Sequence, residues 1–312
     1  METATLTPEQ MQRYVAALNE FRHYRNLTEA EKQLVIKSIL ERPYMDLRCD
    51  WAFKHIMQDM NKLKLLLEDF IPEDIDSVEP LPNELDRFRP DDKNIIMDVL
   101  CKTAHGDSFI VEMQKKKKLS FKNRMFYYGA SMASRQLKSS ESYRKLRPVY
   151  VICFMDFTLE HISEQLVYRY SLKELSSGES YGKQLSIYLC ELPRLQQNNL
   201  QKMDRVEKWF FILKNLCNFA GKPEDIGERY APIARAARTH SLPDEDQLNY
   251  MRAMISEEER LDMGGAYFED GYKKGREEAI LDTAKRLLSL GVTVETIAKA
   301  TGLDSDTLSK LQ

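Results

Sequence analysis

The segment that most constrains this 312-residue chain is Asn94 to Gln114 (NIIMDVLCKTAHGDSFIVEMQ), which predicts a β-hairpin. Two runs rich in Ile, Val, Phe and Leu flank a polar turn, in which Gly106 can take the positive φ of a tight reversal. Asp98 interrupts the first run, and Glu112 ends the second together with Gln114. Because side chains alternate along a strand, Glu112 and Gln114 point to the same face. The hairpin therefore carries polar side chains on strands that are otherwise apolar.

The length of the hairpin loop decides whether these polar residues meet. A three-residue loop or a bulge brings Asp98 opposite Glu112 or Gln114, whereas a loop of two or four residues brings it opposite Met113 and on the wrong face. A site shared by both strands therefore requires an odd register.

Paired acids on one sheet face predict a bound divalent cation. A buried carboxylate is costly unless it is paired or ligates a metal, and two close carboxylates repel unless a cation lies between them. Oxygen ligands without a nearby His or Cys favour Mg²⁺ or Mn²⁺ over zinc. Such an ion commonly activates water against a phosphodiester, so the hairpin indicates hydrolysis of this bond.

The motifs stand in the order found in a known family. Asp98, followed 14 positions later by Glu112-Met113-Gln114, resembles the D…(D/E)-x-K signature of the PD-(D/E)XK nucleases, with Gln in place of Lys. The resemblance is closest to the bacterial Rpn family of recombination-promoting nucleases and transposases, and it covers roughly residues 46–193. It rests also on a D-x-x-F-K motif and on an Arg/Tyr helix followed by a further Tyr: Asp50-Trp51-Ala52-Phe53-Lys54, Arg124, Tyr127, Tyr128 and Tyr143.

This resemblance implies an α/β protein with a mixed sheet flanked by helices, acting as a metal-dependent DNA endonuclease in recombination or transposition. Asp98, Glu112 and the carbonyl of Met113 would hold Mg²⁺ or Mn²⁺. Gln114 stands at the position of the usual Lys. It can orient water or a phosphate oxygen but supplies neither a proton nor a positive charge, which Lys115 and Arg124 could partly replace.

Asp50 has two interpretations. It begins a helix expected over residues 50–70, where Lys54 shares its face at i+4. The resemblance implies a catalytic Asp50 that approaches the metal as an outer or third ligand. The alternative is an Asp that caps the helix and pairs with Lys54.

The charge distribution favours a nucleic-acid partner although the net charge is −3. Residues 113–148 contain eleven Lys or Arg and one acid, and this basic segment directly follows the acidic hairpin. For the turn at Lys115–Lys118, an ordinary solvated turn is the alternative. We expect DNA contacts from five side chains: Lys115, Lys116, Lys122, Arg124 and Tyr128.

Four parts are predicted along the chain: an N-terminal helical extension (1–44), a nuclease-like core (45–193), a helical region (194–262), and a Gly-containing linker helix with a helix-turn-helix-like tail (263–312). Capping boxes at Thr7 and Thr28 begin two helices of the extension. A helix is expected over residues 121–138.

Two features of the tail, its glycines and its helix-turn-helix spacing, each have two interpretations. Glycines at 264, 265, 271 and 275 interrupt a helical pattern; either Gly271 and Gly275, at i and i+4, let another helix approach, or the glycines mark a frayed, flexible segment, which we favour. Residues 294–308 fit the helix-turn-helix spacing, but acids at 304 and 306 favour protein packing over DNA reading. We therefore expect the C-terminal helices to be a place for homo-oligomer contacts.

Composition and motif content narrow the functional classes and the cellular location that fit this sequence. The five cysteines show no C-x-x-C spacing, and no apolar run reaches 18 residues, so we expect a reducing, cytoplasmic location and no membrane partner. Scattered histidines and the lack of G-x-S-x-G disfavour a Ser, Cys or His hydrolase. The remaining rival to a nuclease is a catalytically weak DNA-binding or protein-interaction factor that keeps the fold.

Overall fold

The computed structural model describes residues 6–85, 94–160, 163–289, 292–303 and 307–308. Contacts divide the chain into two compact units. The first comprises Met1–Glu20 and Tyr24–Met254, and the second Phe21–His23 and Ile255–Gln312.

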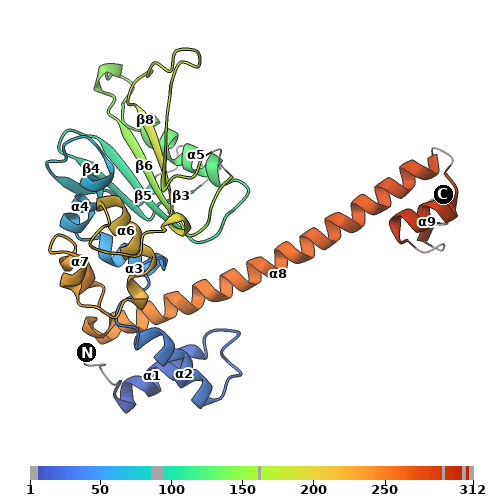
Figure 1. Ribbon diagram of the computed structural model, residues 1–312, viewed down its shortest axis with the longest axis horizontal. Coiled ribbons are helices and arrows are strands. Elements are labelled where there is room, and N and C mark those ends of the chain that lie inside the picture. Colours follow the sequence, from blue (N-terminus) through green and yellow to red (C-terminus); the bar gives the residue numbers. More distant parts are fainter. Residues whose placement is uncertain (1–5, 86–93, 161–162, 290–291, 304–306, 309–312) are drawn as a thin grey trace. The chain divides into compact units, whose positions relative to one another are not determined.

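The first unit is built on a six-stranded mixed sheet with the strand order β1-β4-β5-β6-β8-β7 (Figure 1). β5, β6 and β8 run parallel to one another, whereas β1, β4 and β7 pair antiparallel with their neighbours. A separate pair is formed by β2 (Glu84–Leu85) and β3 (Ile95–Ile96). The six strands are β1 (Val78–Pro80), β4 (Val99–Thr103), β5 (Ser108–Gln114), β6 (Val149–Met155), β7 (Val167–Ser171) and β8 (Leu185–Glu191).

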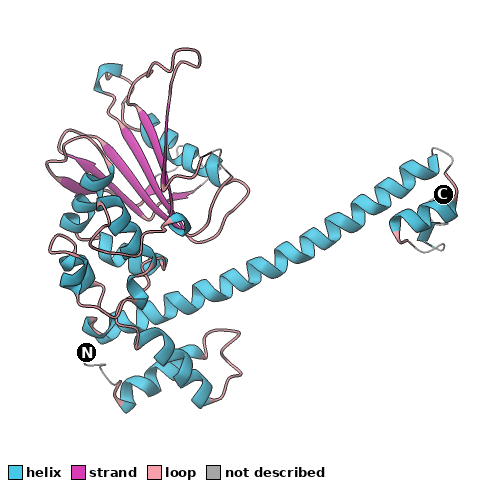
Figure 2. Cartoon of the chain, viewed as in Figure 1, coloured by secondary structure: helices cyan, strands magenta, loops and turns pink. Residues whose placement is uncertain are grey.

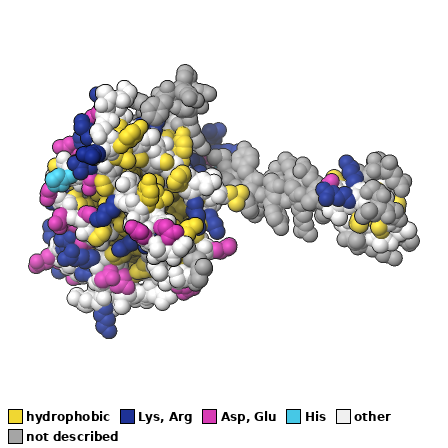
Figure 3. Space-filling model, turned by 90° about the horizontal axis from the view of Figure 1, so that it is seen from above, with side chains coloured by type: hydrophobic (Ala, Val, Ile, Leu, Met, Phe, Trp, Pro, Cys, Tyr) yellow, Lys and Arg dark blue, Asp and Glu magenta, His cyan; other side chains and the backbone are white. Residues whose placement is uncertain are grey.

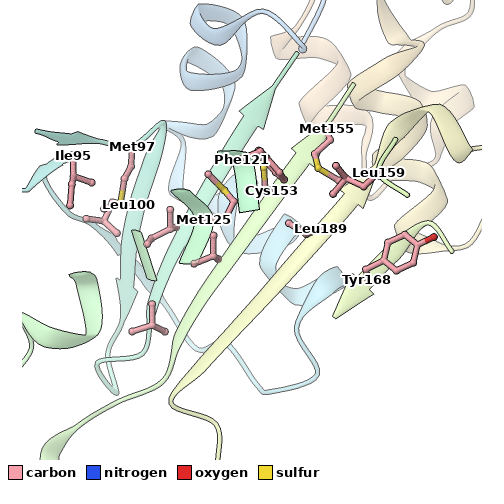
Figure 4. Packing of buried hydrophobic residues seen from close by; sticks show 13 residues of the cluster. Ile95, Met97, Leu100, Phe121, Met125, Cys153, Met155, Leu159, Tyr168 and Leu189 are labelled. Carbon is pink, nitrogen blue, oxygen red and sulfur yellow. The ribbon is translucent and has the colours of Figure 1, made fainter. Parts of the chain in front are cut away.

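Helices cover both faces of this sheet, which confirms the predicted α/β class (Figure 2). On one face, α5 (Phe121–Ser134) connects the parallel strands β5 and β6 and buries Phe121 and Met125 against them (Figure 4). A Cβ atom at Gly129 would lie 2.5 Å from Leu185 Cδ1, so the missing side chain lets α5 approach the sheet closely. α5 ends four residues before the predicted end of the helix.

The other face is covered by α3 (Asp50–Met57) and α4 (Met60–Phe70), whose rings Phe53 and Phe70 contact Phe154 of β6. The prediction of one helix over residues 50–70 was wrong. The carboxylate of Asp59 accepts a hydrogen bond from Asn61 N at 2.9 Å and so begins a new helix.

The first unit is completed by helices from both ends of the chain. Capping boxes at Thr7 and Thr28 begin α1 (Pro8–Leu18) and α2 (Glu29–Leu40), as predicted. Buried Asp69 of α4 accepts hydrogen bonds from Trp209 Nε1 at 3.0 Å and from the Tyr230 hydroxyl at 2.9 Å, which joins the later helices to the sheet unit. The later helices are α6 (Arg205–Lys214) and α7 (Ala231–Ala236). Short 3-10 helices are η1 (Tyr143–Lys145), between α5 and β6, and η2 (Leu192–Arg194), η3 (Leu216–Asn218), η4 (Pro223–Ile226) and η5 (Thr239–Ser241), which follow the sheet.

α8 (Asp244–Ser289) is continuous through the four glycines, so the preference for a frayed segment was wrong. Each glycine costs a helix about 1 kcal/mol relative to Ala, but the flanking residues are mostly good helix formers such as Ala, Leu, Glu, Lys and Arg. In the second unit, Ile297 of α9 (Val294–Thr301) and Leu308 are buried with Ala284 of α8. These elements form a helical hairpin. Asp304 and Asp306, on which the preference for protein packing rested, lie outside the described residues.

Some large apolar side chains remain on the surface, as the yellow areas of one face show (Figure 3). Around the hairpin and α5 they include Ile96, Leu119, Phe126 and Tyr127. Among the described residues, no helix combines the length and the hydropathy needed to cross a membrane.

Candidate functional site

The hairpin brings the two predicted acids together. β4 and β5 pair with Val99 opposite Val111, so Asp98, which precedes β4, lies opposite Glu112. The strands reverse through the three-residue loop 104–106, in which Gly106 has φ 92°, and Thr103 N donates to Asp107 O at 2.9 Å. The odd register that a shared site requires is therefore confirmed.

Each of the two acids accepts a hydrogen bond from the backbone of the opposite arm of the hairpin. Asp98 N donates to Glu112 Oε1 at 3.1 Å, and Met113 N donates to Asp98 Oδ2 at 2.8 Å. The pKa of Glu112 is raised by burial and then by the charge of Asp98; the pKa of Asp98 is raised by burial and then by Asp50. Two buried carboxyl groups of this kind favour either a bound proton or a cation.

α3 brings a positive charge to this pair. Lys54 Nζ lies 2.8 Å from Asp50 Oδ1 and 3.2 Å from Asp98 Oδ1. Burial lowers the pKa of Lys54, but the carboxylates of Asp98 and Asp50 outweigh burial and raise it overall. Asp50 therefore pairs with Lys54, but the prediction that it caps the helix was wrong, because the N-cap of α3 is Cys49. The same ammonium also reaches the hairpin.

α5 brings a second positive charge from the other end of the site. Gln114 Nε2 donates to Glu112 Oε2 at 3.0 Å, while Gln114 Oε1 accepts a hydrogen bond from Arg124 Nη2. The amide can do both because it carries a donor and an acceptor, whereas a Lys at position 114 would have only donors. Among the described residues, Arg124 Nε is buried without a hydrogen-bond partner. Gln114 therefore connects a carboxylate to a guanidinium.

The remaining predicted DNA contacts lie around this centre. Tyr128, one turn after Arg124 on α5, donates its hydroxyl to Ile96 O at 3.5 Å. Lys116 and Lys122 are exposed to solvent, and Lys115 is partly buried beyond the end of β5. Arg124 and Tyr128 thus line the site, while the lysines lie on the surface beside it.

Sequence reasoning missed Arg48, which lies just before α3 and contacts the chain after β6. Its guanidinium binds both oxygens of Asp46 at 2.8 Å and Asp156 Oδ2 at 3.0 Å. Asp156 N in turn donates to Gln114 O at 2.9 Å, at the carboxyl end of β5. Asp46 and Arg48 are close in the sequence, but nothing in the sequence signals their connection to Asp156.

Asp98 and Glu112 offer carboxylate oxygens, the kind of ligand that a hard divalent cation prefers. Within the described ranges, no group of three His, Cys, Asp or Glu side chains is arranged to hold a metal, and Asp50 contacts the Lys54 ammonium. Met113 N donates to Asp98 Oδ2 at 2.8 Å, so the backbone of Met113 lies beside the two acids. Asp98, Glu112 and Met113 remain the predicted ligands.

One protein-family model matches the whole part of the chain that carries the two acids. The model of the PD-(D/E)XK nuclease family transposases matches residues 47–263, which include α3, the acidic hairpin and α5. Searches of curated proteins and of solved structures gave no match. The family match spans more than half of the chain and contains both acids of the hairpin together with Gln114, Lys54 and Arg124. The chain therefore belongs to the PD-(D/E)XK nuclease family transposases.

Proposed function

We propose that this protein is a metal-dependent DNA endonuclease, and that phosphodiester hydrolysis takes place at Asp98 and Glu112. The observation that carries the proposal is the opposition of two buried carboxyl groups across the hairpin, with Lys54 at one end and Arg124 at the other. Membership of a nuclease family supports the reaction class.

Asp98, Glu112 and the Met113 carbonyl are the proposed ligands of Mg²⁺ or Mn²⁺, which when bound lowers the pKa of water and neutralises charge on the phosphate. Lys54 supplies a fixed ammonium beside Asp98, where it stabilises negative charge that develops on a phosphate oxygen.

Gln114 orients Glu112 through its amide nitrogen, and Arg124 holds Gln114 in turn. Asp50 keeps Lys54 in place, which makes Asp50 a positioning residue in this proposal.

The basic segment after β5 gives the DNA backbone a path to the site. Lys115, Lys116 and Lys122 lie directly after the strand that carries Glu112, on or near the surface. Changing all three to Ala should weaken binding to duplex DNA and reduce the salt slope by about 0.9 log units for each phosphate that the variant no longer neutralises. Filter binding across a salt series measures this slope. A slope equal to that of the wild type would show that these lysines form an ordinary solvated turn.

Nicking of supercoiled plasmid in Mg²⁺, Mn²⁺ or EDTA tests the reaction. The wild type should cut with a metal and not in EDTA, and Asp98→Ala and Asp98→Asn should not cut. Asp74→Ala, which removes an exposed acid outside the site, serves as the matched control and should cut as the wild type does. An Asp98→Ala protein that cuts at the wild-type rate would remove the nuclease assignment.

A second candidate is a DNA-binding factor with little catalysis. It is favoured by one observation, the Gln at position 114 where this superfamily signature has Lys. DNA retained on a gel by a wild-type protein that cuts with no metal would support it over the nuclease.

A further inference from the structure

α5 has three faces, one buried against the sheet, one directed to the candidate site and one exposed to solvent. Phe121, Met125 and Gly129 are buried against the sheet. Arg124 and Tyr128 point to the site, where they contact Gln114 and Ile96 O. The outer face carries Lys122, Asn123, Phe126 and Tyr127, all exposed to solvent.

The outer face holds two aromatic rings that are exposed to solvent. Phe126 is 56% exposed and Tyr127 43%, and Leu119, just before the helix, is fully exposed. Single exposed apolar residues are ordinary, but these three lie within nine positions of one another beside the candidate site. A partner that covers the rings would remove apolar surface from water.

Charge on the same surface identifies the chemistry of that partner. Lys122 lies one turn before Phe126, and four consecutive lysines, Lys115–Lys118, precede Leu119. Cations with interleaved aromatic rings match a nucleic-acid strand, in which phosphates alternate with flat bases. A second protein molecule would need a complementary acidic surface to cover the same lysines.

The exposed rings further select an unpaired strand. In duplex DNA each base already stacks on its neighbours, so a ring on a helix surface reaches a base face only where the strand is open. Successive residues of a helix point about 100° apart, so the rings of Phe126 and Tyr127 can contact two separate bases.

We propose that Phe126 and Tyr127 form a base-stacking platform on α5, which holds unpaired nucleotides of a DNA strand next to the site at Asp98 and Glu112. The inference rests on the proposed function and deepens it by naming the substrate class. The preferred substrate is DNA with an open or single-stranded region beside the scissile phosphate.

Fluorescence anisotropy in EDTA tests the platform without catalysis. The affinities of a labelled single strand and of the matching duplex are compared for the wild type, Phe126→Ala and Tyr127→Ala at fixed salt. Loss of one ring should weaken single-strand binding by roughly 5- to 150-fold and leave duplex binding nearly unchanged. A 2-aminopurine base in the strand should lose its stacking-dependent quenching in both variants.

Three further variants separate stacking from other effects. Phe126→Leu keeps apolar area but has no π-face, so it should behave as Phe126→Ala does; Phe126→Trp should bind the single strand at least as tightly as the wild type. Tyr143→Ala removes another exposed Tyr of the same basic segment and should change little.

Several results would overturn the platform. Unchanged single-strand affinity in Phe126→Ala and Tyr127→Ala, while the wild type cuts plasmid, would remove it and leave the proposed function intact. Sedimentation that shows a wild-type dimer and a Phe126→Ala monomer, with equal DNA affinities, would assign this face to a second copy of the chain. A wild type that binds neither DNA form would remove both proposals.

Discussion

Lys54 Nζ lies 3.2 Å from Asp98 Oδ1, so a residue of α3 delivers an ammonium to the acid that precedes β4. Gln114, at the position of the usual strand lysine, cannot carry this charge and instead accepts a hydrogen bond from Arg124. The positive charge of the site therefore comes from helices on both sides of the hairpin.

Replacing Lys54 by Met should reduce plasmid cleavage by about 10²-fold or more, because one fixed charge at a developing anion contributes on this scale. DNA affinity in EDTA should hardly change, since Lys54 is bound to two carboxylates and contributes little free charge. Nicking rates and filter binding measure the two effects. Lys62→Met, which removes another half-buried lysine paired to an acid, is the control. Equal cleavage by Lys54→Met and wild type would confine Lys54 to a structural role.

Restoring the signature lysine with Gln114→Lys should lower activity in this chain. The new ammonium would face the Arg124 guanidinium, and these two like charges repel. Arg124 would also lose the amide oxygen of Gln114, which now accepts its hydrogen bond. Sequence reasoning without this contact predicts that activity is kept or increased. A double variant Gln114→Lys, Arg124→Ala should recover part of the loss. A single variant that cuts faster than the wild type would show that Arg124 moves away from position 114.

Removing the carboxylate of Glu112 should change how stability depends on pH. Burial raises the pKa of Glu112 to about 8 in the folded protein. The folded state thus binds a proton that the unfolded chain releases near pH 4.3, so metal-free stability should fall as the pH rises toward about 8. Glu112→Gln should show a smaller decline, confined to the acidic end of the range, because burial also raises the pKa of Asp98, to about 6. Thermal unfolding in EDTA from about pH 5 to pH 9 compares the two slopes; parallel curves would contradict the shift.

The same linkage predicts that Mg²⁺ binds more tightly as the pH rises, because the cation needs ionised carboxylates. Titration calorimetry at several pH values, in buffers with different ionisation enthalpies, should detect proton release on binding. Release should diminish above about pH 8, where Glu112 is already ionised. Asp98→Asn should bind Mg²⁺ weakly throughout.

Deleting residues 292–312 should leave DNA affinity and cleavage nearly unchanged, because the candidate site lies wholly in the first unit. The deletion removes Ile297 and Leu308, which are buried with Ala284 at the end of α8, and so exposes apolar surface there. Altered assembly or solubility is therefore expected in sedimentation experiments. A large loss of DNA affinity at fixed salt would instead assign a DNA contact to this hairpin.

Local patterns in the sequence determined the elements that carry the site. Strand alternation placed Glu112 and Gln114 on one face, and the turn residues allowed the three-residue loop that brings Asp98 opposite Glu112. The capping boxes at Thr7 and Thr28 likewise predicted where two helices begin. These features depend on neighbours a few positions apart, so a single sequence shows them.

Tertiary packing decided which side chains meet across those elements. The contact of Lys54 with Asp98 joins residues 44 positions apart, and Arg48 reaches Asp156 over a longer separation. Apolar periodicity predicts that α3 packs on the sheet, but the rotation and position of the helix depend on how rings such as Phe53 and Phe154 fit together. Only the folded chain therefore shows that the lysine missing from the strand is matched by one on a helix.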